Sequence, residues 1–278
     1  MKSSLTESNT KDLRKIANEL RRIALTMIWK AGSGHPGSSL SEAEIIAALY
    51  FKVLNIDPSN PTWSERDRFI LSKGHGSPTL YAALSKRGFF DSKELDHFRE
   101  YGSLTPSYPD LKTPGVDMVS GSLGNGLAAG ASMAKTSKLM GISNHVYVLL
   151  GDGELEEGLV WEAAMFAAHH KLDNLTAIVD RNKLQINGTT EELMSIEPLA
   201  SKWEAFGWET CEVDGNNIDE VVEALSRDNS LNMPRVVIAQ TIKGKGVSFM
   251  EGVKEWHTKQ LTSDEYAKAM SELDAKDC

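Results

Sequence analysis

Cysteine is scarce in this chain: its 278 residues include two, Cys211 and Cys278. Two cysteines are too few for a disulfide framework or a zinc site, so we expect unpaired thiols in a reducing compartment. Runs of about 18 apolar residues, which a membrane-spanning helix needs, are missing as well. The polar segment MKSSLTESNTKD at the amino terminus lacks the apolar centre of a signal peptide. We therefore predict a cytoplasmic protein with no membrane partner.

Positive charge is also in short supply. The chain has 30 Lys and Arg residues against 39 Asp and Glu residues, which gives a formal net charge of −9 and a pI of about 5.3. The basic residues are scattered rather than gathered in a stripe, so long-range electrostatics oppose the binding of nucleic acid and of anionic membranes. We exclude nucleic acid as a partner.

Apolar runs alternate with helical patterns along the whole chain. Strands that are apolar throughout are typical of a mostly parallel sheet covered by helices on both faces, so we predict a doubly wound α/β fold. The composition, 41% hydrophobic and 25% charged, supports a full core. We expect residues 1–278 to form a single domain in which residues 1–10 are flexible. The predicted strands are residues 68–72, 144–150, 175–179, 208–213 and 236–241, and the predicted helices are residues 11–30, 41–53, 78–86, 92–101, 157–170, 191–206, 218–225 and a last helix to Leu273 with a capping box of Thr262 and Glu265.

The middle of the chain reads as a strand, a helix and a second strand, at residues 144–150, 157–170 and 175–179. The handedness of such a unit places the carboxyl ends of both strands at one edge of the sheet. Asp152 lies in a GDG turn directly after the first strand, and Asn182 follows the second. We expect these two side chains to share that edge.

A carboxylate and an amide oxygen at this edge indicate a site for a hard cation. Asp152 and Asn182 stand 30 positions apart (182 − 152 = 30), and their oxygens suit Mg²⁺ or Ca²⁺ rather than zinc. A cation beside a helix N-terminus in turn suits a phosphate group. A GDG tripeptide by itself is more often a simple turn, so the spacing and the preceding strand carry the prediction.

The stretch from GDG to this asparagine resembles the thiamine diphosphate motif, in the form found in the transketolase family. The resemblance implies the diphosphate-domain fold of that family and a bound Mg²⁺, which Ca²⁺ or Mn²⁺ can replace. It implies that Asp152, Asn182 and the backbone carbonyl of Leu184 bind this metal ion. The implied cofactor contacts in this stretch are Gly151, Asp152, Gly153, Glu154 and Asn182.

A glycine pattern near the amino terminus offers an alternative that we reject. Gly32, Gly34 and Gly37 satisfy GxGxxG, the fingerprint of dinucleotide binding. That fingerprint follows a strand and precedes an acidic strand end by about 20 residues, whereas here the predicted helix at residues 11–30 comes first. The same segment, AGSGHPGSSLS, resembles the transketolase segment whose histidine enters the active site, which indicates His35.

Two further histidines lie in segments that resemble transketolase active-site segments. His75 ends DRFILSKGH, and His257 follows a KGKG loop. Taken alone, the first is a polar loop residue and the second follows a solvated turn. The resemblance implies that all three histidines polarise the substrate carbonyl and relay protons, with pKa values near neutrality. It also implies that His75 contacts the cofactor, and that His35 and His257 contact the substrate.

Three more segments carry candidate site residues. SGSLGNG resembles the transketolase segment in which glycines admit the cofactor close to the backbone, and it indicates Gly121, Leu123 and Gly124. Glu157 matches an acidic residue of the family's hydrogen-bond network at the dimer interface. In the proline-rich loop LTPSYPDLKTPGV, Tyr108 stands where the family has a histidine that contacts the donor. The alternative is an aromatic loop residue that only covers the site.

The likeness extends from about Lys11 to about His257 and covers only the cofactor-diphosphate domain of transketolase. It implies the N-terminal subunit of a two-subunit transketolase, which uses thiamine diphosphate and Mg²⁺ to transfer a two-carbon ketol unit from a ketose (phosphate) to an aldose (phosphate). In the family, the glutamate that activates the aminopyrimidine belongs to another domain. The implied partner is therefore a C-terminal transketolase subunit with the pyrimidine-binding domain, in a heterotetramer with two of each.

Two other functions stay open at this point. One is a subunit of a different thiamine diphosphate-dependent carboligase that acts on a non-standard sugar. The other is a subunit that binds the cofactor without catalysis. The presence of His35, His75, Asp152 and Asn182 argues against the second.

Overall fold

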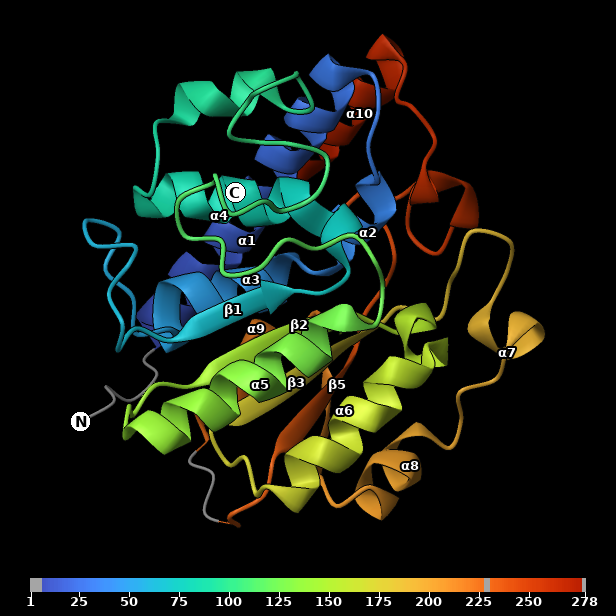
Figure 1. The fold of residues 1–278 in the computed structure, drawn as a ribbon. Coiled ribbons are helices and arrows are strands. Elements are labelled where there is room, and N and C mark those ends of the chain that lie inside the picture. The colour runs from blue at the N-terminus through green and yellow to red at the C-terminus, as the bar shows by residue number, and fades with distance from the viewer. Residues whose placement is uncertain (1–6, 228–230, 277–278) are drawn as a thin grey trace.

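A computed structural model describes residues 7–227 and 231–276 (Figure 1). Five strands form one sheet in the order β1-β2-β3-β5-β4, and every neighbouring pair is parallel. The strands are β1 (Arg68–Leu71), β2 (Val146–Gly151), β3 (Leu175–Arg181), β4 (Glu209–Asp214) and β5 (Arg235–Gln240). This confirms the predicted parallel α/β fold.

Helices lie on both faces of the sheet in Figure 1, with α1, α3 and α4 on one side and α5, α6 and α8 on the other. The α-helices are α1 (Glu7–Ala31), α2 (Pro36–Ser41), α3 (Ala43–Ala48), α4 (Ser77–Arg87), α5 (Asn125–Met140), α6 (Gly158–His169), α7 (Thr190–Leu193), α8 (Leu199–Ala205), α9 (Ile218–Ser226) and α10 (Ser263–Asp274). Short 3-10 or π segments are η1 (Leu49–Val53), η2 (Gly74–Gly76), η3 (Ser92–His97), η4 (Gly153–Glu156) and η5 (Lys254–His257).

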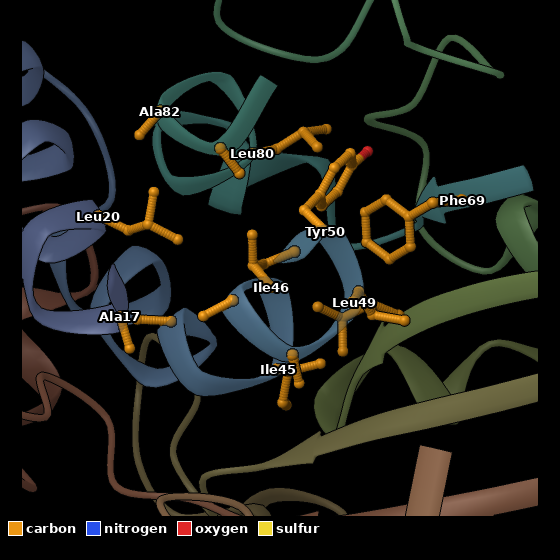
Figure 2. Close-up of a cluster of buried hydrophobic side chains, with 14 of the residues drawn as sticks. Ala17, Leu20, Ile45, Ile46, Leu49, Tyr50, Phe69, Leu80 and Ala82 are labelled. Carbon is orange, nitrogen blue, oxygen red and sulfur yellow. The ribbon is translucent and has the colours of Figure 1, made fainter. Parts of the chain in front are cut away.

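Successive strand residues face two separate cores, because side chains alternate across a strand. On β2, Tyr147 and Leu149 pack with α1, α3, α4 and α9, whereas Val148 and Leu150 pack with α5, α6 and α8. Figure 2 shows part of the first core, where Ile46 of α3 lies among side chains from α1 and α4. Both faces are thus covered, which explains why the strands read as continuous apolar runs.

Three predicted helices differ from those observed. The helix at residues 41–53 begins earlier, at Pro36, and is interrupted at Glu42. The helix at residues 92–101 is wrong beyond His97, because the chain leaves the 3-10 segment and Arg99 takes a left-handed φ of 67°. The helix at residues 191–206 is two short helices, α7 and α8, since Pro198 disfavours helical backbone at the residue before it.

The ends of the chain agree with the sequence in part. The capping box is confirmed, because Thr262 accepts from the Glu265 backbone N–H while the Glu265 carboxylate accepts from the Thr262 backbone N–H. Residues 7–10, expected to be flexible, begin α1, and residues 1–6 lie outside the described part of the chain. Cys211 is a free thiol, and Cys278 is not among the described residues. No helix in the described ranges is long and apolar enough to cross a membrane.

Candidate active site

A cavity of about 360 Å³ opens at the carboxyl ends of β1, β2 and β3, where the loop after β5 and the segment before α2 also meet. Ligands of parallel α/β sheets bind at this end. Twelve of the residues indicated by the sequence line the cavity: His35, His75, Tyr108, Gly121, Leu123, Gly151, Asp152, Gly153, Glu154, Asn182, Leu184 and His257. Two others, Gly124 and Glu157, do not line it.

The three histidines form one cluster, although they come from three distant segments. Ring centroids are 5.2 Å apart for His35 and His75, 5.4 Å for His35 and His257, and 5.3 Å for His75 and His257. Burial is the main reason that the pKa falls to about 4 for His35, to about 3 for His257 and well below 6.5 for His75. These pKa values differ from the near-neutral ones we expected. Near pH 7 the rings are therefore neutral hydrogen-bonding groups.

Asp152 is buried at the end of β2 in a net of hydrogen bonds. Its carboxylate accepts from the backbone N–H groups of Gly153 and Lys183, and from Arg181 at 3.2 Å. Arg181 is itself shared with Glu191 and Glu197, so one guanidinium serves three carboxylates. Burial and the nearby charge of Asp180 raise the pKa of Asp152. The negative charge here is only partly compensated by the protein.

Asn182 and Leu184 complete a set of hard oxygens on the same wall of the cavity. The Asn182 side-chain oxygen accepts from the Leu184 backbone N–H at 3.1 Å, which fixes the turn after β3. The Leu184 carbonyl accepts from the ammonium of Lys243 at 3.0 Å. Within the described residues, no three His, Cys, Asp or Glu side chains gather around a common metal position. A metal ion here would therefore rely on amide, backbone and ligand oxygens beside Asp152, which suits Mg²⁺ rather than zinc.

Two buried lysines of the site were missed by the sequence reading. Lys73 lies between β1 and His75, and its ammonium donates to Asp180. Lys243 comes from the KGKG loop that we read as a solvated turn, yet its side chain lines the cavity and is 2% exposed. Burial lowers the pKa of Lys243 to about 8. The one available signal was position, since Lys73 directly follows the predicted strand at residues 68–72 and Lys243 comes two residues after the one at residues 236–241.

Glu154 joins three loops around the cavity. Its carboxylate accepts from the backbone N–H of Gly124 at 2.8 Å, from that of Gly151 at 3.0 Å and from the Ser72 hydroxyl. Gly124, at the start of α5, therefore does not line the cavity itself but holds Glu154, which does. Glu157 is exposed at the start of α6, packed against Gly124 rather than turned into the cavity.

Tyr108 lies at the mouth of the cavity, 40% exposed. Its ring rests on Gly121, where an added Cβ atom would lie 3.2 Å from the ring. The loop that carries it is held by Arg99, whose Nε donates to the Ser107 hydroxyl at 2.8 Å. The tyrosine hydroxyl can therefore meet a ligand that enters from solvent.

Comparison with known proteins gives this site a family. Residues 13–277 match the family model described as transketolase, thiamine diphosphate binding domain. The 6-deoxy-6-sulfo-D-fructose transketolase subunit SqwG of Clostridium sp. (strain MSTE9) is 46% identical over 265 residues, which cover 95% of this chain and 96% of that subunit. An apulose-4-phosphate transketolase subunit of Phocaeicola vulgatus is 41% identical over 254 residues, with 91% and 90% covered.

Longer transketolases match over part of their length. The Homo sapiens transketolase is 39% identical over 262 residues, which are 94% of this chain and 42% of that protein. The crystal structure of Campylobacter jejuni transketolase superposes with a TM-score of 0.89 at 35% identity and covers 97% of this chain and 43% of that one. The cavity lies where this fold binds its ligands. The chain thus belongs to the transketolase family, as a thiamine diphosphate-binding domain.

Proposed function

We propose that this chain, as a single domain, is the N-terminal subunit of a two-subunit transketolase that transfers a two-carbon ketol unit from a ketose to an aldose. The observation that carries the proposal is one cavity that unites the oxygens of Asp152 and Asn182 with the three neutral histidines. Relatives of similar length that are named transketolase subunits support it. The cytoplasmic location stays a prediction from composition.

The residues of the wall fit a metal ion bound to a diphosphate. Asp152 carries negative charge that Arg181 only partly compensates, so a cation would be stabilised beside it. Lys243 is a buried ammonium whose hydrogen bond goes to a neutral carbonyl, so an anion would be stabilised there. We assign Mg²⁺, or Ca²⁺ or Mn²⁺ in its place, to Asp152, Asn182 and the Leu184 carbonyl. When bound, thiamine diphosphate supplies the nucleophilic carbon that breaks and forms the C–C bond.

The histidines act as hydrogen-bonding groups for the sugar. Because His35 and His257 are neutral near pH 7, each ring can donate one proton to a carbonyl or hydroxyl oxygen and accept one from a hydroxyl group. His75 is held by the Ser38 hydroxyl, 3.1 Å from its Nε2, and we assign it to the binding of the cofactor. Together they orient the donor and move protons between its oxygens.

A partner subunit is expected to cover the cavity from outside. Apolar side chains are exposed on or beside α5 and α6, namely Leu123, Leu139, Met140, Met165 and Phe166. Such residues favour a large apolar interface. We assign this surface, with the exposed Glu157, to contacts between subunits, and assign to the partner the pyrimidine-binding domain with its activating glutamate. A heterotetramer with two of each subunit follows from the family likeness.

The substrate is proposed to be an unusual sugar or sugar phosphate. The two subunits compared above are named for 6-deoxy-6-sulfo-D-fructose and for apulose 4-phosphate. Tyr108 lies at the cavity mouth, where its reach and its lack of positive charge would change the shape recognised near the transferred carbons. The proposed enzyme is therefore a transketolase that acts on a non-standard sugar, which was the substrate class of the alternative carboligase. The complete histidine cluster disfavours the other alternative, a subunit that binds the cofactor without catalysis.

Reconstitution tests the function. The purified chain should show no ketol transfer with thiamine diphosphate and Mg²⁺, and it should gain turnover when the C-terminal subunit is added, because the activating glutamate comes from that subunit. A panel of ketose donors and aldose acceptors measures this, with the Asp152→Asn chain plus partner as the inactive control. Steady turnover by the chain alone, or none by the pair with any donor, would refute the proposal.

A further inference from the structure

A buried acid that the proposed chemistry does not use lies beneath the histidines. Glu42 stands at the break between α2 and α3; its side chain is fully buried and does not cap α3. Within the described residues, no group donates a well-aligned hydrogen bond to either of its carboxyl oxygens. Its contact is an ion pair with Lys73, 2.7 Å from Nζ to Oε2.

Lys73 does not need this second carboxylate for charge balance. Asp180 already pairs with its ammonium and also accepts from the hydroxyl groups of Ser41 and Thr241. Although burial opposes charge on Asp180, Lys73 and these hydroxyl groups lower its pKa. Glu42 is thus a surplus acid, and burial raises its pKa to about 8. An apolar side chain of similar volume would avoid this desolvation cost, so stability alone does not explain Glu42.

Two sets of contacts lead from Glu42 to His75. In the first, Lys73 Nζ also donates to the Ser38 carbonyl at 3.1 Å, and the Ser38 hydroxyl lies 3.1 Å from His75 Nε2. In the second, the carboxyl group packs on the backbone of Gly76, where an added Cβ atom would lie 2.5 and 2.6 Å from its two oxygens. Because Gly76 directly follows His75 in η2, a displaced Glu42 would also displace the histidine backbone.

We propose that Glu42 is a positioning residue of this site, which fixes Lys73 and Gly76 and through them sets the place and the electrostatic surroundings of His75. Its relevance to catalysis rests on the proposed function, whereas the contacts themselves belong to the fold. The charged groups that face Glu42 are Lys73, after β1, and Asp180, on β3. Lys243, from the loop after β5, acts on these two rather than on Glu42 directly.

NMR of the full chain with ¹⁵N-labelled histidine tests this without cofactor or partner. The pKa of His75 lies well below 6.5, so between about pH 7 and about pH 9 its ring stays neutral, and a step in its ¹⁵N shifts reports a neighbouring group. We expect a step near pH 8 in the wild-type chain, where Glu42 loses its proton. Because Lys243 also titrates in this range and its charge acts on His75, the test variant is Glu42→Gln made in the Lys243→Met chain, and it should lose this step. Lys243→Met, which removes the other group that titrates in this range, should keep it.

Glu44→Gln is the matched control, because Glu44 is a neighbouring buried acid that pairs with Arg21 instead of Lys73; it should keep the step.

In the assembled enzyme, Glu42→Gln should lower kcat about tenfold with KM within about twofold, and remove the change in kcat near pH 8. A His75 step that persists in the double variant, or that is absent from Lys243→Met, would overturn the assignment. The second result decides even if Glu42→Gln fails to fold. Ketol transfer that is absent while the step is present would instead refute the proposed function alone.

Discussion

Two lysines lie buried in the same site and contact different partners. We call Lys73, Asp180 and Glu42 the floor of the site, and Asp152, Asn182, Leu184 and Lys243 its wall. In the floor, Lys73 lies between the carboxyl groups of Asp180 and Glu42; burial alone would lower its pKa, but the two acids outweigh that effect and raise it. In the wall, Lys243 donates to the neutral carbonyl of Leu184, and burial lowers its pKa to about 8.

The difference separates the floor, where the protein itself balances the charges, from the wall, where a ligand would balance them. The ammonium of Lys73 is balanced within the fold, so it needs nothing from outside. The carboxylates of Asp152 and Asp180 favour the charge of Lys243 but do not outweigh its burial, and the guanidinium of Arg181 that pairs with Asp152 is shared with two other acids. A metal ion bound to a diphosphate would supply both missing counter-charges. The wall is therefore expected to control cofactor affinity, and the floor to control stability and the position of His75.

Removing the floor lysine should have the largest effect. Lys73→Met leaves Asp180 and Glu42 without their ammonium, and breaking a buried ion pair from one side costs about 3–5 kcal/mol. We expect the free energy of unfolding to fall by that amount in urea denaturation. Lys93→Met, at an exposed lysine of η3, is the control and should change it by less than about 0.5 kcal/mol. A loss in Lys73→Met no larger than that in Lys93→Met would contradict the role of the buried ion pair in stability.

Removing the charge of the wall carboxylate should come next. Asp152→Asn keeps the size of the side chain but loses the charge of the proposed metal ligand, so the affinity for thiamine diphosphate with Mg²⁺ should fall on the order of 100-fold, or about 2.7 kcal/mol. Calorimetry on the assembled enzyme measures this. Asp96→Asn, at a surface aspartate paired with Lys30, should bind like the wild type. An Asp152→Asn enzyme with unchanged affinity would remove this residue from the metal site.

The wall lysine should affect binding rather than stability. Lys243→Met would remove the ammonium that we propose binds the diphosphate, and we expect cofactor affinity to fall about tenfold or somewhat more, equivalent to about 1.5 kcal/mol. The desolvation cost of the ammonium disappears as well, so the free energy of unfolding should stay the same or rise. A Lys243→Met chain that loses as much stability as Lys73→Met would show that both lysines belong to the floor.

The smallest effect is expected at the cavity mouth, outside both floor and wall. Tyr108→His should shift relative kcat/KM among ketose donors by about tenfold, or about 1.4 kcal/mol of transition-state discrimination. Stability and cofactor affinity should be unchanged, because the ring is partly exposed. A donor panel with the partner present checks this. The same donor ranking within about twofold for both enzymes would make Tyr108 an aromatic residue that only covers the site.

The sequence predicted the parts of the site that follow strands in recognisable segments. The βαβ order placed Asp152 and Asn182 at one edge, and in the structure both line one cavity. The central strands β2, β3 and β5 were predicted well because strands covered on both faces are mostly apolar, whereas the edge strand β4 carries polar residues and is only partly buried. The helix at residues 191–206 was predicted wrongly, because Pro198 disfavours helical backbone before it and the segment forms two short helices.

The floor could not be read from the sequence. Asp180 lies within a strand that is otherwise mostly apolar, and Glu42 lies within a helical pattern. Lys73 lies two residues before His75, in a segment where the resemblance indicates only the histidine. Each looks like an ordinary polar residue, because a buried ion pair forms between positions far apart in the chain. Lys73 and Asp180 are 107 positions apart. The low pKa values of the histidines were missed for the same reason, since burial is a property of the packed fold.

Metal dependence of cofactor binding tests most directly the claim that the wall awaits a metal–diphosphate ligand. Thiamine diphosphate is titrated calorimetrically into this chain with its partner subunit, once with Mg²⁺ and once with EDTA. We predict affinity at least about 100-fold higher with Mg²⁺, with the gain lost in Asp152→Asn. Equal affinity in Mg²⁺ and in EDTA would contradict the account, because Asp152 would then hold no metal ion that contributes to cofactor binding.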